Sequence, residues 1–185
     1  MGRVLSSLTL AGWVLLELSV RFWETAQGRG RTGHDRFTRV LIGVSIGLAI
    51  GLGVGIAHGH SGQIPRTARG VGLVLMWLGL AVRAWAIVTL GKSFRTTVEV
   101  DPNQPVVSTG PYARIRHPSY TGLLLIVLGL GLALGDWVSL ILCALLPWPA
   151  VLVRIRVEEA ELERVLGGAY VEYEGRTKRL IPGVW

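Results

Sequence analysis

The chain has 185 residues, of which 50% are apolar and 17% are charged, and it carries a net charge of +7. A soluble domain has about 25% charged residues, so this composition favours a protein embedded in lipid and excludes a disordered chain. The single cysteine, Cys143, excludes a disulfide framework within the chain. The arginines fall between apolar runs and form no stripe of their own, which argues against a nucleic-acid partner.

Five apolar runs predict five transmembrane helices in an all-α integral membrane protein. They cover residues 4–20, 40–57, 71–90, about 116–134 and 137–153. The first run has no signal-peptide cleavage site after it, so we expect it to be retained as a helix. The last two runs, joined by a turn at Gly135-Asp136, predict a helical hairpin. Pro147 and Pro149 are expected to bend its second arm.

Small and charged residues mark two of these runs. Four glycines recur every four residues in the second run, at Gly43, Gly47, Gly51 and Gly55, and predict a flat surface against which another helix packs closely. Arg83 lies within the third run, where a charge is costly. It either faces the bundle interior or a wet cavity, or it extends toward the nearer interface.

The basic residues predict the orientation of the chain in the membrane. With five spans, the loops 21–39 and 91–121 and the charged, amphipathic tail 154–185 share one side, and they hold 15 of the 19 Lys and Arg residues. The positive-inside rule therefore predicts an N-terminus outside the cell inner membrane and a cytoplasmic tail. We expect the polar chemistry, in contact with membrane lipids, on the cytoplasmic side.

Two polar segments are candidates for that chemistry. Pro118 suits the first turn of the fourth span, which places His117 at an N-terminal boundary able to bind an anion. The alternative is an interfacial belt of Tyr, Arg and His side chains. Arg154 and Glu158 are four residues apart and share one helix face. They form either an exposed ion pair, worth a few tenths of a kcal/mol, or a cavity wall that holds an anion and a cation.

Four short sequences within residues 91–183 together resemble the isoprenylcysteine carboxyl methyltransferase family and, more distantly, the membrane phospholipid N-methyltransferases. They are RHPSYTG at 116–122, EEAEL at 158–162, GGAYVEY at 167–173 and RLIPG at 179–183. The resemblance implies S-adenosylmethionine as methyl donor and a lipophilic or prenylated acceptor that enters from the bilayer. It also divides a single structural domain into three N-terminal spans, residues 1–90, and a cofactor-binding region, residues 91–185.

The resemblance also places site residues on this chain, and it implies no metal. The implied cofactor-binding positions are Gln104, Pro105, Val106, Val107, Tyr112, His117, Pro118, Ser119, Tyr120 and Glu158. Arg154 falls on the catalytic position that orients the substrate, and Arg83 is a second candidate for substrate binding. Thr97 is expected to border the cofactor. Gln104 stands where eukaryotic members of the family have histidine.

The chemistry of these residues favours a carboxylate acceptor. A carboxylate is ionised at pH 7 and needs no general base, so the task of the protein is alignment, which the forked guanidinium of Arg154 suits. An amine acceptor would need a base, for which His117 and Glu159 are the candidates. A thiol acceptor stays open as well.

Two other classes of function stay open. The first is an oxidoreductase resembling the membrane sterol reductases, which use NADPH, with Arg95, Arg114 and Arg116 as phosphate-binding candidates. The second is a membrane protein that binds or scaffolds without catalysis. Neither accounts for the four short sequences as directly as a methyltransferase does.

Overall fold

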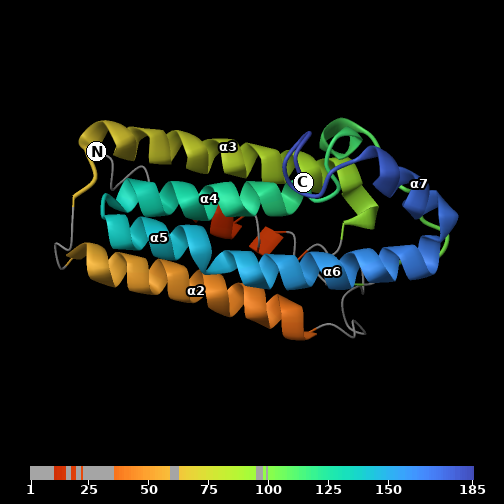
Figure 1. The fold of residues 1–185 in the computed structure, drawn as a ribbon, viewed down its shortest axis with the longest axis horizontal. Coiled ribbons are helices and arrows are strands. Elements are labelled where there is room, and N and C mark those ends of the chain that lie inside the picture. Colours follow the sequence, from red (N-terminus) through yellow and green to blue (C-terminus); the bar gives the residue numbers. More distant parts are fainter. Residues whose placement is uncertain are drawn as a thin grey trace.

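The computed structural model describes residues 11–15, 18, 19, 22, 36–58, 63–94, 98 and 100–185, and every regular element among them is helical (Figure 1). An all-α membrane fold is therefore confirmed. Most of the predicted first span, residues 4–20, lies outside the described residues, although 11–15, 18 and 19 are helical.

Among the described residues, three helical stretches are long and apolar enough to cross a membrane, namely Phe37–Ala57, Arg66–Leu90 and Trp137–Leu166. They correspond to α2 (Arg36–His58), to α3 (Arg66–Leu90), and to α5 (Trp137–Leu145) together with α6 (Pro147–Leu166). The shorter apolar α4 (Pro118–Leu134) lies between α3 and α5 in Figure 1. Large apolar side chains on the outer surface of these helices, such as Trp77 and Trp85, are exposed, as a lipid environment allows.

Glycines bring α3 and α4 into close contact. A Cβ atom on Gly79 would lie 2.6 Å from the carbonyl oxygen of Gly122, and the reverse pair has the same distance. Gly72 and Gly129 repeat this arrangement two turns away, again at 2.6 Å. Since only a residue without a side chain fits at these four positions, the two backbones pack directly on each other.

The glycine repeat of α2 makes no close contact with the other described helices of this chain. No described atom lies within 4 Å of a Cβ atom built on Gly43, Gly47, Gly51 or Gly55. Within the described part of this chain, no other helix therefore packs closely on this surface, and close packing against a second copy stays a prediction. A spacing of four shows that small residues share a helix face, but it does not show what lies opposite that face.

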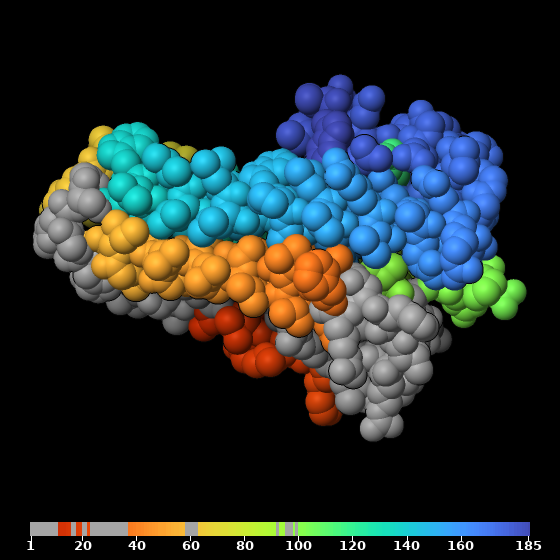
Figure 2. Space-filling model, turned by 60° about the horizontal axis from the view of Figure 1, so that its bottom comes forward, coloured from red at the N-terminus to blue at the C-terminus, as the bar shows by residue number. Residues whose placement is uncertain are grey.

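The helical hairpin forms as its turn residues predict. Gly135 ends α4 in the left-handed region at φ 79°, and Asp136 caps α5 by accepting a hydrogen bond from the backbone N–H of Ser139. The helix is interrupted at Leu146, because Pro147 and Pro149 cannot donate backbone hydrogen bonds. Figure 2 shows α2 lying along α5 and α6 on one face of the molecule.

The tail extends the hairpin and then folds back over it. The last membrane span was predicted at residues 137–153, with Arg154 and Glu158 on the helix beyond it, and α6 does continue to Leu166 before a turn at Gly167 and α7 (Gly168–Arg176). The C-terminal segment then pairs with the start of α4. The N–H of Arg116 donates to the carbonyl oxygen of Lys178 at 2.7 Å, and that of His117 donates to the carbonyl oxygen of Arg179 at 3.0 Å.

Candidate active site

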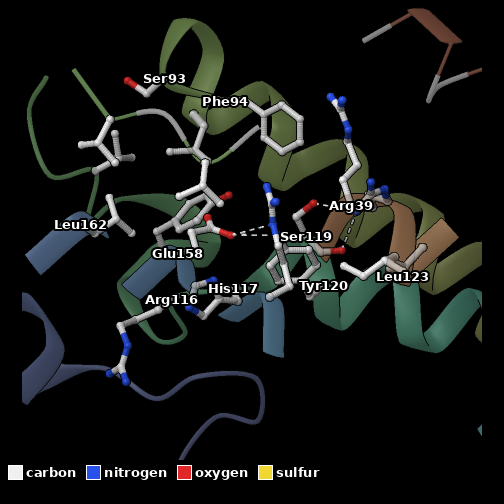
Figure 3. A pocket seen from close by; sticks show the side chains of 18 of the residues that line it. Arg39, Ser93, Phe94, Arg116, His117, Ser119, Tyr120, Leu123, Glu158 and Leu162 are labelled. Carbon is white, nitrogen blue, oxygen red and sulfur yellow. Dashed lines mark hydrogen bonds and ion pairs between the residues drawn. The ribbon is translucent and has the colours of Figure 1, made fainter. Parts of the chain in front are cut away.

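A cavity of about 520 Å³ lies where α2, α3, α4, α6 and α7 meet the 91–107 connection (Figure 3). On the α2 side its lining carries Arg39 and an apolar stretch formed by Ile42, Gly43, Ile46, Gly47 and Ile50. We call this side the α2 wall. The opposite wall carries polar side chains from α3, α4 and α6. Such a volume is in the range of small-molecule sites, which is about 300–1,000 Å³.

Arg154, Tyr120 and Glu158 form the polar centre of the cavity. The Nε–H group of Arg154 donates to the hydroxyl of Tyr120 at 3.0 Å, and this hydroxyl donates to Oε2 of Glu158 at 2.8 Å. Arg154 also donates from Nη1 to the hydroxyl of Thr38 on α2 at 3.0 Å. Figure 3 shows Tyr120 and Glu158 projecting from different helices toward this centre.

Of the two predicted arrangements, Arg154 and Glu158 therefore form part of a cavity wall and not an exposed ion pair. The side chain of Arg154 is only 3% exposed, whereas that of Glu158 is 30% exposed, and both line the cavity. Their closest N–O distance is 3.8 Å, so Tyr120 connects them more closely than they contact each other. Among the described residues, Glu158 is the one acidic side chain in the lining.

Arg83 faces the bundle interior, which decides between its two predicted positions. It is 7% exposed, lines the cavity, and donates from Nη1 to Ser119 at 3.0 Å for the carbonyl oxygen and 2.8 Å for the hydroxyl. These bonds replace the water that an arginine loses at membrane depth. The alternative, in which Arg83 extends to the interface, is wrong.

Glu159 lies beside the cavity in a separate ionic cluster. Its carboxylate accepts hydrogen bonds from Arg116 and Arg179, each at 2.8 Å, and lies 3.2 Å from Nε2 of His117. Arg116 also donates to Glu174 at 3.0 Å. This cluster, from here on the Glu159 cluster, fastens the C-terminal segment to the start of α4.

The Glu159 cluster argues against two alternatives, an amine acceptor with Glu159 as base and an oxidoreductase that binds NADPH. Glu159 is buried and does not line the cavity, so it is badly placed to accept a proton from a bound amine. Arg116 already forms ion pairs with Glu159 and Glu174. Its positive charge is therefore largely neutralised and is poorly suited to bind the phosphate of a dinucleotide. Arg114 is exposed and does not line the cavity, and Arg95 lies outside the described residues.

Most of the residues implied as cofactor-binding come together in the lining. These are Gln104, Pro105, Val106, Val107, Tyr112, His117, Ser119, Tyr120 and Glu158. Pro118 is buried outside the lining, where it begins α4 as predicted. Thr97 lies outside the described residues.

Several lining residues were not predicted. Arg39 on α2 had no signal in the sequence, and neither did Thr38, which lies outside the lining and accepts a hydrogen bond from Arg154. Tyr170 and Tyr173 lie within GGAYVEY, which gave no indication of the direction in which each ring points. Further apolar residues of the lining are Trp13, Val14, Leu18, Leu90, Phe94, Val98, Val100, Leu123, Leu162 and Leu166.

Two tyrosines of the lining belong to its rigid frame. The hydroxyl of Tyr173 donates to the carbonyl oxygen of Tyr112 at 2.8 Å, which joins α7 to the short helix η2 (Gly110–Ala113). Burial raises the pKa of Tyr173 to about 12 and places that of Tyr112 far above its ordinary value. Both side chains therefore stay neutral at physiological pH and act as hydrogen-bonding groups.

The fold and the cavity define an integral membrane protein whose polar site lies among transmembrane helices, within reach of molecules with a charged head and an apolar tail. The family model for isoprenylcysteine carboxyl methyltransferases matches residues 71–164, about half of the chain. The chain belongs to this family. The matched residues include Arg83, Arg154 and Glu158, whereas α2 and α7 lie outside them.

Curated and solved relatives agree with this membership. The chain is 35% identical over 115 residues to protein-S-isoprenylcysteine O-methyltransferase B of Arabidopsis thaliana, covering 61% of this chain and 58% of the relative. It is 37% identical over 112 residues to protein-S-isoprenylcysteine O-methyltransferase of Schizosaccharomyces pombe, covering 60% and 48%. The chain thus spans about half the length of the curated relatives it matches.

A solved structure with the same fold is that of the eukaryotic intramembrane Ras methyltransferase ICMT. It is 30% identical to this chain, with a TM-score of 0.59, and the match covers 63% of this chain and 43% of that one.

Proposed function

We propose that this protein is an S-adenosylmethionine-dependent methyltransferase that esterifies the carboxylate of an isoprenylcysteine-like or other isoprenoid acceptor. The observation that carries the proposal is the set of Arg154, Tyr120 and Glu158 in one interhelical cavity. This set offers a cation for an acceptor carboxylate next to an anion for a cationic donor. The names of the relatives support the same reaction.

The lining of the cavity fits the methyl donor. S-Adenosylmethionine, when bound, supplies a methyl group on a sulfonium, together with an ammonium, a carboxylate and an adenosine. Glu158 is assigned to a cationic group of the donor, because it is the acidic lining residue. Tyr112 and residues 104–107 are assigned to the other parts of the donor. Neutral tyrosines suit an adenosine better than a charged group would.

Arg154 is the residue assigned to the acceptor carboxylate. Its bonds to Tyr120 and Thr38 fix the plane of the guanidinium, so a carboxylate bound to it is held in one orientation. Orientation is most of what this reaction needs, because the carboxylate is already ionised and no proton has to move. The surrounding apolar side chains exclude water, which favours a reaction in which opposite charges neutralise each other.

The α2 wall is assigned to the apolar tail of the acceptor. Gly43 and Gly47 line the cavity, and a Cβ atom on either would meet open space. Together with Ile42, Ile46 and Ile50 they leave an apolar surface beside the polar centre. The tail would enter this space from the bilayer, in an inner membrane with the site on the cytoplasmic side, as the distribution of Lys and Arg predicts.

Calorimetry on the detergent-purified protein tests the proposal. We expect S-adenosylhomocysteine to bind and NADPH not to bind. With radiolabelled S-adenosylmethionine and an S-prenylated N-acetylcysteine, we expect a base-labile methyl ester. Binding of NADPH without S-adenosylhomocysteine would overturn the assignment.

A further inference from the structure

The helix α7 places a buried hydroxyl without a partner beside the cavity. Tyr170 is 3% exposed and lines the cavity, and its hydroxyl makes no hydrogen bond to any described residue. It is the one buried side-chain polar atom in this condition within the described part of the chain. Buried polar groups are almost always paired, and an unpaired one costs free energy. The unpaired hydroxyl therefore indicates a partner that is bound only part of the time.

The neighbouring Tyr173 shows how a tyrosine in this wall is paired when its role is structural. Its ring lies 5.9 Å from that of Tyr170, and both rings line the cavity. The hydroxyl of Tyr173 donates to the carbonyl oxygen of Tyr112, whereas the hydroxyl of Tyr170 has no such acceptor. On the same helix, Tyr173 therefore has a structural hydrogen bond, whereas the hydroxyl of Tyr170 has none within the described protein.

The surroundings of Tyr170 indicate the chemistry of the missing partner. Burial raises the pKa of its hydroxyl far above the ordinary value, so the group is neutral and can both donate and accept. On the α6 and α7 side, the lining contains the apolar or aromatic Leu162, Leu166 and Tyr173, and α6 also contributes Arg154 and Glu158. The carboxylates of Glu158 and Glu159 act on this hydroxyl and disfavour an anionic partner, while the tilted ring of Tyr173 beside it suits a flat, uncharged group with hydrogen-bonding edges.

We propose that Tyr170 is a further donor-binding residue, whose hydroxyl forms a hydrogen bond to the adenosine part of S-adenosylmethionine. The inference rests on the proposed function and extends it to a helix outside the matched residues 71–164. Binding of the donor then satisfies the one buried hydroxyl that the described protein leaves unpaired.

The substitution Tyr170→Phe tests this inference because it removes only the hydroxyl. Calorimetry would use S-adenosylhomocysteine and 5′-methylthioadenosine, which keeps the adenosine and lacks the amino-acid end. We expect the affinity for both ligands to fall about tenfold, the usual result of losing one hydrogen bond to a ligand. The melting temperature of the ligand-free protein should stay the same or rise, because an unpaired hydroxyl is removed.

Tyr173→Phe is the matched control, since it removes a paired hydroxyl from the same wall. It should lower the melting temperature of the ligand-free protein. If Tyr170→Phe lowers that temperature as well, the hydroxyl is structural and the inference is wrong. Unchanged affinity for both ligands would also overturn it, and a loss confined to S-adenosylhomocysteine would rule out the adenosine. If the unsubstituted protein binds neither ligand, the proposed function itself fails.

Discussion

The two sides of the cavity use glycine in opposite ways. On α3 and α4, Gly72, Gly79, Gly122 and Gly129 let two backbones touch, and the polar residues held by these helices are fixed in place. On α2, glycines that recur every four residues face open space, and two of them line the cavity. A glycine repeat in a transmembrane helix thus indicates a smooth face, and only the neighbouring helix decides whether that face is a contact or a space.

The difference also separates what the chain shares with its family from what it does not. The matched residues 71–164 contain the closely packed helices and the polar centre, whereas the α2 wall lies outside them. We therefore expect substitutions in the packed wall to affect folding and catalysis, and substitutions in the α2 wall to affect the choice of acceptor.

The largest effect is expected at the packed wall, for Gly79→Leu. A Cβ atom there would lie 2.6 Å from the carbonyl oxygen of Gly122, so the side chain forces α3 and α4 apart. Overpacking costs about 1–3 kcal/mol in ordinary cores, and a leucine against backbone should cost at least that. Thermal unfolding and size-exclusion chromatography in detergent measure the loss. The control is Gly51→Leu on α2, which should fold normally; equal damage by both would show that the glycines of the two walls do not differ.

Next in size is the effect of Arg154→Ala on turnover. Removing the guanidinium leaves the acceptor carboxylate unaligned, and we expect kcat to fall on the order of 10²- to 10³-fold. The affinity for S-adenosylhomocysteine should change little, because Glu158 and the 104–107 segment remain. Single-turnover methylation and calorimetry separate the two quantities. Persistent turnover would move the alignment to another cation, with Arg83 the first to test.

A smaller effect is expected for Glu158→Ala, measured as donor binding. Losing a charge-assisted contact to the donor should weaken the affinity for S-adenosylhomocysteine by about 10- to 100-fold. Glu161→Ala is a suitable comparison, since this carboxylate on the same helix is paired with the exposed Arg164 and lies outside the lining. Equal affinity of both variants would make Glu158 an ordinary surface charge.

The smallest effect is expected at the α2 wall, for Gly47→Leu. A Cβ atom there meets open space, so we expect the new side chain to enter the apolar part of the cavity and leave folding and donor binding unchanged. We expect the ratio of kcat/KM for a long prenyl acceptor to that for a short one to fall by about tenfold, in keeping with the 1–3 kcal/mol that a hydrophobic pocket can discriminate. Gly51→Leu again serves as control. An unchanged ratio would place the acceptor tail elsewhere.

Local patterns in the sequence predicted much of the fold. Apolar runs predicted the helices, Pro118 the start of α4, and Gly135 with Asp136 the turn of the hairpin. The shared helix face of Arg154 and Glu158 and the amphipathic pattern after residue 153 predicted that the helix continues beyond the apolar run, and α6 does continue to Leu166. A change of polarity along a helix marks a change of surroundings and not the end of the helix.

The site was predicted less completely, because its contacts join distant parts of the chain. The spacing of Arg154 and Glu158 placed them on one helix face, but the bond from Arg154 to Thr38 spans 116 residues. The bridging role of Tyr120 likewise depends on how α4 meets α6. Such contacts follow from helix packing, which periodicity within one helix does not determine.

The uninterrupted course of α6 beyond residue 153 has a consequence for how two very different reactants meet. Arg154 and Glu158 are four residues apart, so they stand about 6 Å apart along the helix axis. In the proposed roles, Arg154 binds an acceptor that arrives from the lipid bilayer, and Glu158 binds a donor that arrives from the aqueous phase. Because α6 is one continuous helix across the membrane–water interface, it holds both binding residues at a fixed separation. A lipid-soluble acceptor and a water-soluble donor can therefore meet at this turn, although they partition into different phases elsewhere.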